Sequence, residues 1–415
     1  MSAGAGPGTR AASPAAAVPA AGKGSALRRL AGSSAVSMLG SRMTAIACPL
    51  LVLRMTGSPA AAGWAMLAAT APAALAYLPA GALVDRGSPG RILLWAECGR
   101  GAAIGVVVAA VALGRASVAL LVAATVAEGV LRAFSALAEL ACVRALAGGQ
   151  LPSAVAVTEA RGNAALLAGR PLGALLFGIA PALPFAGDLL TFAYSAATLA
   201  ALRGWLPGSQ EAPARATRLA ADIREGLRWV RHHPFARVML VVGFTATLTA
   251  QAAIMVFLAR AHAVRLPALD TGVVLSAAGA GGLLGSAAGP WLVLRAGRYW
   301  AQAQVLAWLL ALAAMWLQAA QPLVMAPALA LMGLAGAAGN IAQGTCLMSE
   351  GRPGMLARVM SLSELAGLVA GMAGAPLGGI LAQDLGARGA VACLLLLMAL
   401  PVLALAASRR REARS

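Results

Sequence analysis

Charged residues are scarce in this sequence. Of its 415 residues, 11% are Asp, Glu, Lys or Arg and 60% are hydrophobic, whereas a water-soluble domain usually carries about 25% charged residues. The mean hydropathy is +0.81, so the chain has too few polar side chains to enclose its apolar content in a soluble core. The shortage of charge therefore excludes a soluble globular protein and places most of the chain in a lipid bilayer.

Residues that carry enzyme chemistry are also few. The chain has 3 His and 5 Cys, and no cysteines form a Cys-x-x-Cys pair, so buried thiols are favoured over disulfides or metal sites. The sequence contains no ATP-binding glycine loop, no His/Cys metal cluster and no nucleophile–base pair. We therefore expect no enzyme, no metal and no cofactor.

Acidic residues are much rarer than basic ones. The sequence has 14 Asp and Glu against 32 Lys and Arg, a net charge of +18, and Lys23 is its single lysine. A basic balance is typical of nucleic-acid binding, but these arginines fall between apolar runs and form no basic face with aromatic residues between. That placement is typical of cytoplasmic membrane loops, and we expect no nucleic-acid partner.

Long apolar runs dominate what is present. Each is near the ~20 residues that a membrane-spanning helix needs. The sequence therefore predicts an all-α membrane protein with twelve spans, at 30–53, 60–84, 92–113, 117–141, 153–180, 183–202, 237–259, 270–294, 300–319, 323–348, 357–382 and 389–407.

The more polar segments divide the chain into five parts. Residues 1–27, rich in Ala, Gly, Pro and Ser, are expected to be a disordered cytoplasmic tail. Residues 28–203 and 237–407 are expected to form two six-helix bundles, and 408–415 a basic cytoplasmic tail. The linker 204–236 is expected to be cytoplasmic, because its apolar residues recur at helical spacing among charges and so predict an amphipathic helix on the membrane surface: Leu219, Ile223, Leu227 and Val230.

The arginines also predict an orientation. With both termini on the inner side, few arginines fall in outer loops, which agrees with the positive-inside rule. We therefore expect a multi-pass protein of the inner (plasma) membrane with cytoplasmic termini, embedded in lipid and monomeric.

One polar junction stands out between two apolar runs, Gly81-Ala-Leu-Val-Asp85-Arg86-Gly-Ser-Pro-Gly-Arg91. Its Gly, Pro and Ser residues predict a tight loop. A carboxylate at Asp85 that met the start of the eleventh span would gain about 0.3–1 kcal/mol from the helix dipole. Such a contact would hold the two halves together on the inner side, although Asp85 and Arg86 could also mark topology alone.

The two halves resemble each other in sequence. Pro171-Leu-Gly173 in the fifth span matches Pro376-Leu-Gly378 in the eleventh at an offset of 205 residues. Other residues match at similar offsets, namely Glu159 with Glu364 and Arg91 with Arg298. These matches predict a duplication, and half-repeats of this kind are a transporter architecture with the substrate path between the halves.

The chain resembles the major facilitator superfamily of transporters. Gly81, Asp85 and Arg86 match that family's loop between its second and third helices, and Arg91 fits its last basic position loosely. The segment Asp222-Ile-Arg-Glu-Gly-Leu-Arg-Trp-Val-Arg-His-His-Pro234 resembles the central loop of the drug and siderophore export branch, which includes the enterobactin exporter and macrolide efflux proteins. Arg358-Val-Met-Ser-Leu resembles that branch as well.

This resemblance implies two six-helix bundles and proton-driven efflux of an antibiotic, siderophore or other small hydrophobic or amphipathic metabolite. An importer of a small metabolite on the same fold is the alternative. Family exporters often carry a Gly-Pro pair in helix five, whereas this chain has Gly169-Arg170-Pro171. Arg170 is therefore either a functional charge or drift.

Charges inside spans cost about 2.5–3.5 kcal/mol each, so they should face a cavity or pair with one another. A proton-coupled transporter needs a buried acid that can load and release a proton. Glu128 is the first candidate because it lies mid-span, and structural ion pairing is the alternative for any single acid. The further candidates are Glu159, Asp188 and Glu364 for the proton, and Arg42, Arg132, Arg170, Pro171, Gly173, Pro376 and Gly378 for helix pairing or the substrate path.

Overall fold

Helices make up every regular element in the described part of the chain. The computed structural model describes residues 20–147, 151–206, 228, 234–296, 299–317, 325–350 and 356–412. The first half contains α1 (Ala20–Thr56), α2 (Pro59–Arg86), α3 (Pro89–Ala112), α4 (Val118–Ala147), α5 (Leu151–Ile179) and α6 (Leu183–Ala201). The second half contains α8 (Pro234–Ala263), α9 (Ala268–Ala296), α10 (Trp300–Leu317), α11 (Met325–Glu350), α12 (Leu356–Leu397) and α13 (Ala399–Glu412).

Most of these helices have the length and the apolar composition of membrane-crossing segments. Nine stretches in the described part are long and apolar enough to cross a membrane. The most C-terminal of them, Leu365–Ala406, contains a reversal at Gly386, where φ is 66° and ψ is 179°. It therefore counts as two crossings, and α5 and α6 are two further helices of 29 and 19 residues. The predicted all-α fold is confirmed, and the predicted count of twelve spans is approximately met.

Proline and serine set the short junctions between helices. Ser58 caps α2, accepting a hydrogen bond from the Ala61 amide at 3.1 Å, and Pro59 opens the helix. Pro59 at this position loses no hydrogen bond, because the first N–H groups of a helix have no partner inside it. At the polar junction found in the sequence, α2 continues to Arg86 and α3 begins at Pro89. The connection is therefore tighter than the predicted loop.

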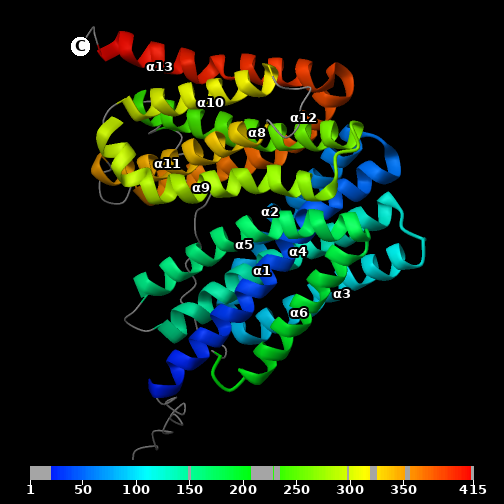
Figure 1. The fold of residues 1–415 in the computed structure, drawn as a ribbon. Helices are drawn as coiled ribbons and strands as arrows, with labels where there is room; N and C mark the ends of the chain where they lie inside the picture. Colours follow the sequence, from blue (N-terminus) through cyan, green and yellow to red (C-terminus); the bar gives the residue numbers. More distant parts are fainter. Residues whose placement is uncertain are drawn as a thin grey trace, which may run out of the picture.

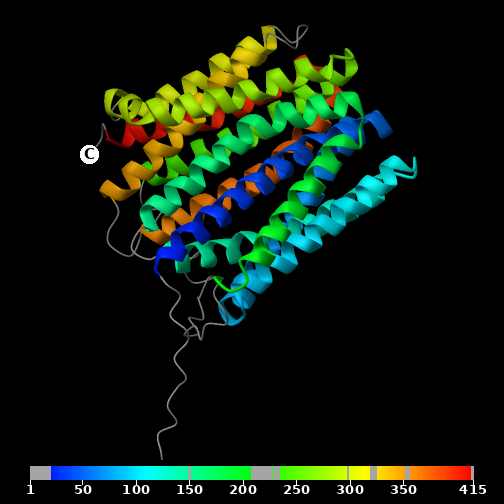
Figure 2. The ribbon, with the colours of Figure 1, turned by 60° about the horizontal axis from the view of Figure 1, so that its bottom comes forward.

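The helices form two bundles that join at one end. Figure 1 shows the first half (blue to green) below the second half (yellow-green to red), and Figure 2 shows the same grouping from another side. We call the end with Ala20 and Glu412 the termini end, and the end with Gly386 the far end. One hydrophobic core at the far end contains residues of both halves, such as Phe185 and Phe257. At the termini end each half has its own core.

Two glycine–proline contacts connect the halves. A Cβ on Gly63 of α2 would meet the main chain of Pro376 in α12, and a Cβ on Gly272 of α9 would meet the main chain of Pro171 in α5. Glycine is therefore needed at both places for the helices to approach this closely. Beside the first contact, the Ser58 hydroxyl donates to Gln383 Oε1 at 2.6 Å.

The same packing recurs in the two halves. Gly173 lies against the main chain of Met43 in α1, and Gly378 lies against the main chain of Ala252 in α8. Three further glycine contacts follow the same rule, with offsets of 204 to 209 residues: Gly169 and Gly374, Gly129 and Gly333, Gly63 and Gly272. The contacts thus reproduce the duplication predicted from sequence, and they fix which residues of the halves are equivalent.

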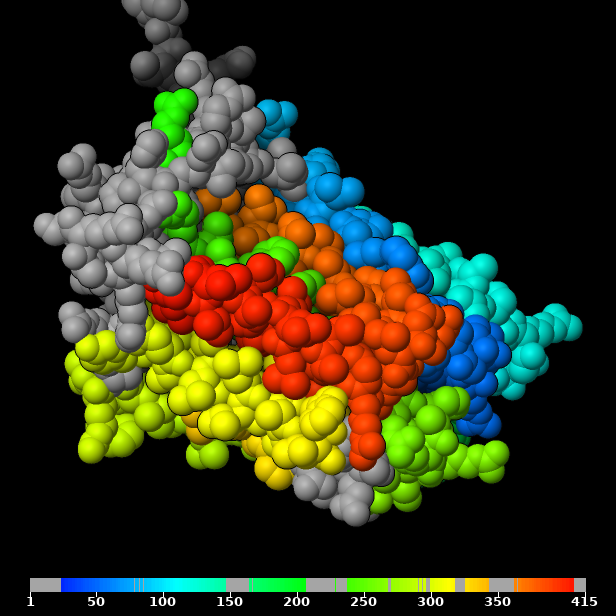
Figure 3. Space-filling view, turned by 90° about the horizontal axis from the view of Figure 1, so that it is seen from above, coloured from blue at the N-terminus to red at the C-terminus, as the bar shows by residue number. Residues whose placement is uncertain are grey.

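Large apolar side chains face outward on the second half. Figure 3 looks onto α13, α12 and α10. On these helices Leu403 is 64% exposed, Leu396 is 74% exposed and Leu306 is 57% exposed. Side chains this apolar are stable at such a surface in contact with lipid chains rather than water.

The structure bears on two of the predicted segments, the N-terminal tail 1–27 and the linker 204–236. α1 begins at Ala20, inside the stretch 1–27 that the sequence assigned to a disordered tail, because Ala and Leu favour helix there despite the nearby Gly residues. Of the linker 204–236, the structure describes only residues 204–206, 228 and 234–236. The amphipathic helix predicted within this linker therefore lies outside the described residues, apart from residue 228.

The junction of the halves can be tested by cross-linking. We expect a Ser58→Cys/Gln383→Cys protein, with the 5 native cysteines replaced, to form a disulfide under mild oxidation. Adding Gly63→Leu should lower the cross-linking yield several-fold, because the new side chain meets Pro376. Gly367→Leu is the matched control, since nothing lies within 4 Å of a Cβ there. An equal yield in both variants would contradict the contact.

Candidate functional site

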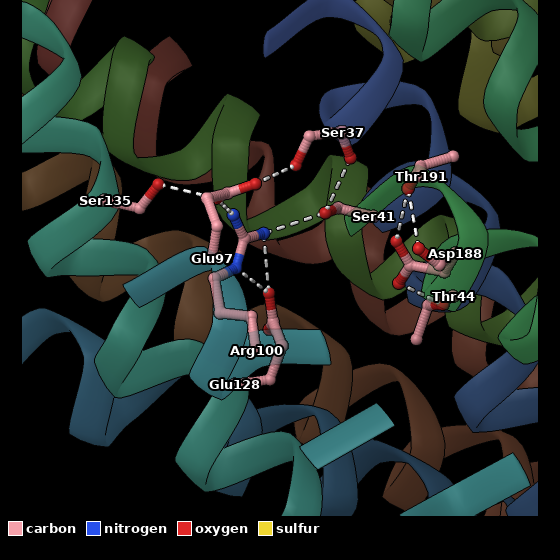
Figure 4. Close-up of polar contacts among 9 residues, drawn as sticks. All are labelled: Ser37, Ser41, Thr44, Glu97, Arg100, Glu128, Ser135, Asp188 and Thr191. Atoms are coloured by element: carbon pink, nitrogen blue, oxygen red, sulfur yellow. Dashed lines mark hydrogen bonds and ion pairs between the residues drawn. The ribbon is translucent and has the colours of Figure 1, made fainter. Parts of the chain in front are cut away.

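A cluster of buried charges lies inside the first half, centred on Arg100 of α3 (Figure 4). Its Nη1 donates to Glu97 Oε1 at 2.7 Å, and its Nη2 donates to Glu128 Oε1 at 2.8 Å. Nε donates to the same Glu128 oxygen at 3.0 Å, and Nη2 also reaches Ser41 Oγ at 2.8 Å. One guanidinium therefore serves two carboxylates, which is the arrangement that charges inside a membrane require.

Both carboxylate oxygens of Glu97 accept hydrogen bonds from neighbouring side chains. The Ser37 hydroxyl of α1 donates to Oε2 at 2.9 Å, and the Ser135 hydroxyl of α4 donates to Oε1 at 2.8 Å. Glu97 is 3% exposed and Arg100 is 5% exposed. A buried ion pair persists only when its remaining lone pairs and protons are also hydrogen-bonded, and these serines supply those bonds from two other helices.

A fourth helix contacts the cluster through an aromatic ring. The Cζ atom of Arg100 lies 4.5 Å from the centroid of the Phe192 ring of α6. A guanidinium at this distance is attracted by the ring face. Arg100 thus connects α3 with α1, α4 and α6 in the middle of the first bundle.

Asp188 of α6 lies near this cluster with a different set of partners (Figure 4). It is 1% exposed. The Thr44 hydroxyl of α1 donates to Oδ2 at 2.6 Å, and the Thr191 hydroxyl lies 3.3 Å from Oδ1. Among the described residues it makes no ion pair. Hydroxyls can donate to a carboxylate or accept from a protonated acid, so this site accommodates both charge states.

A cavity of about 210 Å³ adjoins the cluster, and we call it the first-half cavity. Glu97 and Arg100 line it together with Arg42, Arg132 and Glu139. Polar and charged side chains therefore surround a space between the helices of the first half, large enough for several water molecules.

A second cavity, of about 460 Å³, lies among α8, α9, α10 and α11, and we call it the second-half cavity. Its polar lining is mostly uncharged and includes Gln251, Gln304 and Asn340. Arg170 reaches it from α5 of the first half, so this cavity borders the interface between the bundles.

The structure separates the predicted site residues into several places. Glu128 and Asp188 belong to the polar centre of the first half, Arg42 and Arg132 line the first-half cavity, and Arg170 lines the second-half cavity. Pro171 and Pro376 lie at the contacts between halves, whereas Gly173 and Gly378 pack within their own halves.

The polar junction from Gly81 to Arg91, which was predicted to form a gate on the inner side, lies at the termini end. A Cβ added to Gly81 would lie 3.9 Å from the side chain of Leu137 in α4. Arg86 and Arg91 are exposed. The side chain of Asp85 lies outside the described part of the structure, as do those of Glu159 and Glu364, so the proposed Asp85 contact stays a prediction.

Glu97 and Arg100 were not among the candidates selected from the sequence. Their spacing of three residues places them on one helix face, and this spacing could have indicated an ion pair. The serines that complete the cluster gave no signal, because their convergence depends on how α1 and α4 pack against α3.

The equivalent positions in the second half carry different chemistry. At the offsets that relate the halves, Arg42 corresponds to Gln251 and Glu97 to Gln304. The cluster's other members correspond to small or apolar residues: Arg100 to Ala307, Glu128 to Met332, Ser135 to Gly339, Ser41 to Ala250 and Ser37 to Ala246. Because the second half reaches the same helix packing without the charges, the charges are not needed to form the bundle.

Comparisons with known proteins agree on the architecture. The sequence profile of the family described as Major Facilitator Superfamily matches residues 30–375. No curated protein sequence matches the chain. Similar solved structures include a bacterial homologue of the iron transporter ferroportin in an inward-facing state, with 18% identity, TM-score 0.67, and coverage of 92% of this chain and 98% of that one.

Two other similar structures come from different transporters. The nucleoside transporter NupG has 12% identity and TM-score 0.69, with 91% of this chain and 97% of that chain covered. A D-xylose-proton symporter has 14% identity and TM-score 0.65, with 91% and 96% covered. Identities this low show a shared fold and carry no substrate across.

The repeat suggests a stability test of the cluster. We expect Arg100→Leu to lower the free energy of unfolding by about 3–5 kcal/mol, because it leaves buried carboxylates without their cation. The triple variant Glu97→Gln/Arg100→Ala/Glu128→Met copies the second half and should recover most of that loss. Thermal unfolding of the purified protein in detergent measures both. A triple variant less stable than Arg100→Leu would contradict this account.

Proposed function

Because this chain belongs to the major facilitator superfamily, we propose that it is a secondary active efflux transporter. It exchanges protons for a small hydrophobic or amphipathic molecule, such as an antibiotic, a siderophore or another secondary metabolite, by alternating access. It works in the inner (plasma) membrane as a monomer with cytoplasmic termini, and it needs no cofactor or catalytic step.

The observation that carries this proposal is the set of partners around Asp188. A proton carrier has to exist in two charge states during each cycle. Asp188 is bound by the hydroxyls of Thr44 and Thr191, which tolerate both states, whereas Glu128 shares its oxygen with the Arg100 guanidinium. This difference favours Asp188 over Glu128, the first candidate from sequence, as the group that loads and releases the proton.

Arg100 supplies the coupling to the rest of the first half. Protonation of Asp188 removes a negative charge close to the Arg100–Phe192 pair. Arg100 holds Glu97 and Glu128 and contacts four helices through its partners. A change of charge at Asp188 therefore alters the forces on α1, α3, α4 and α6 together. A switch of the bundle between two positions requires such a joint effect on its helices.

The arrangement of the two bundles supports alternating access. One core joins the halves at the far end, and separate cores lie at the termini end. With the termini in the cytoplasm, this arrangement corresponds to a state closed toward the outside. Export then requires the far-end contacts at Gly63 and Gly272 to open while the termini end closes.

The test uses everted membrane vesicles and a substrate found by drug-susceptibility profiling of cells with and without the gene. We expect an acid-inside gradient to drive accumulation of that compound. Asp188→Asn should reduce the initial rate to that of vesicles without the protein, since the amide cannot exchange a proton. Asp384→Asn, at an exposed acid of α12, is the matched control and should keep the rate.

Other results would overturn the proposal. Accumulation without proton dependence in vesicles, together with uptake by whole cells, would indicate an importer. Full proton-driven transport in Asp188→Asn would remove Asp188 as the carrier, and the same measurement on Glu128→Gln would then decide whether Glu128 takes that role.

A further inference from the structure

The two cavities occupy equivalent places in the repeated halves. Residues that line the first-half cavity correspond, at the offsets that relate the halves, to residues that line the second-half cavity. Three such pairs exchange a charged side chain for a neutral one: Arg42 and Gln251, Glu97 and Gln304, Arg132 and Gly336. Loss of those charged groups leaves a larger space, about 460 Å³ against 210 Å³.

The size and lining of the second-half cavity are those of a ligand pocket. A volume of ~300–1,000 Å³ holds a drug-sized molecule. Its walls carry the aromatic side chains of Trp300 and Trp308, and amide groups are placed among apolar residues. The first-half cavity is instead smaller and is lined by the Glu97–Arg100 ion pair, so the two equivalent spaces differ in size and in charge.

Arg170 gives the second-half cavity a positive charge. Among the residues that the structure describes, it is the one charged residue that lines this cavity, and no acidic residue lines it. No hydrogen bond or ion pair joins Arg170 to another residue in the described part of the chain, and its neighbour across the Gly169 contact is Arg42, a second cation. A guanidinium without a partner among the described residues is costly inside a membrane, and a negatively charged ligand would supply such a partner.

Hydrogen-bond donors in the cavity point to the same ligand chemistry. Trp308 is 3% exposed, and its indole Nε1 has no acceptor among the described residues. Gln251, Gln304 and Asn340 add amide donors. A ligand rich in acceptor oxygens satisfies these groups, whereas a cationic ligand meets Arg170 with no counter-charge.

Helix packing does not account for Arg170. Its equivalent in the second half is Ala375, and the preceding glycines, Gly169 and Gly374, make the same contacts in both halves. The position therefore tolerates a small side chain, and the arginine is an addition to a helix that packs without it.

We propose that the second-half cavity is the substrate pocket and that it takes a small organic anion. The carboxylate or phenolate oxygens of the substrate bind Arg170, and its aromatic or apolar body lies among Trp300, Trp308 and the surrounding aliphatic residues. This inference rests on the proposed function and names the substrate class for it.

The test measures binding to the purified full-length protein in a non-ionic detergent. The probes are 2-naphthoate, 2-naphthamide and 2-naphthylmethylammonium, which share one ring system and differ in charge. We expect the carboxylate to bind at least about tenfold more tightly than the amide, the difference typical of a charge-assisted hydrogen bond, and the ammonium to bind least.

Variants assign that preference to the cavity. Arg170→Ala copies Ala375 and should reduce the preference for the carboxylate to about twofold or less, a loss of the ionic contribution. Arg115→Gln removes an exposed arginine and should leave the preference unchanged. Asn340→Asp is isosteric and adds a negative charge to the cavity, so it should shift selectivity toward the ammonium probe even if Arg170→Ala fails to fold.

Several results would overturn the inference. They are equal binding of the three probes, binding of none of them, or a carboxylate preference that persists in Arg170→Ala or is unmoved by Asn340→Asp. If these occur while proton-driven export in vesicles still depends on Asp188, the substrate class is wrong and the exporter proposal stands. If proton-driven export is also absent, both are wrong.

Discussion

The cost of a charge in the hydrocarbon core governs the whole molecule. Each ionised group within a span costs several kcal/mol unless it is paired or faces a polar cavity. Glu97, Arg100 and Glu128 meet this requirement by binding one another and by recruiting serines from α1 and α4. The same rule directs the remaining span arginines toward cavities, because lipid offers them no partner. Charge placement therefore identifies the interior of the transporter.

The internal duplication separates what the fold needs from what function needs. Both halves use the same glycine contacts, as at Gly173 and Gly378, so these residues serve packing. The charged cluster has no counterpart beyond Gln304 in the second half, and that half still packs with Ala307 and Met332 in the equivalent places. The two halves pack alike but differ in the side chains that line their cavities, so those side chains are not dictated by the shared packing.

The sequence predicted much of this architecture. Apolar runs near the length of a membrane span gave twelve segments, and short matches such as Pro171-Leu-Gly173 with Pro376-Leu-Gly378 gave the repeat. Both signals are local, so they can be read without a structure. The reversal at Gly386, within one long helical stretch, was also expected, because the span predicted for 357–382 ended just before it.

The site was harder to predict, because it depends on contacts between helices. Glu128 was preferred for its mid-span position, yet position along a helix does not tell whether an arginine on another helix will neutralise it. Asp188 gave the same kind of signal as the other buried acids, and its hydroxyl partners became visible only when α1 and α6 were packed together. Arg170 was recognised as a departure from a family pattern, but its cavity is formed by helices more than sixty residues away in sequence.

The sign of the substrate's charge also bears on the direction of transport. In a cell whose interior is negative, moving one negative charge outward across the membrane releases about 2.3 kcal/mol for each 100 mV. Inward movement of a proton in exchange releases energy from the same field. An exporter whose pocket carries Arg170 and no acid among its described lining residues, and whose other half holds Asp188 in a site suited to two charge states, would thus draw on the membrane potential twice in each cycle. On this proposal Asp188 lies outside the second-half cavity for a physical reason, because an acid placed beside the substrate anion would repel it.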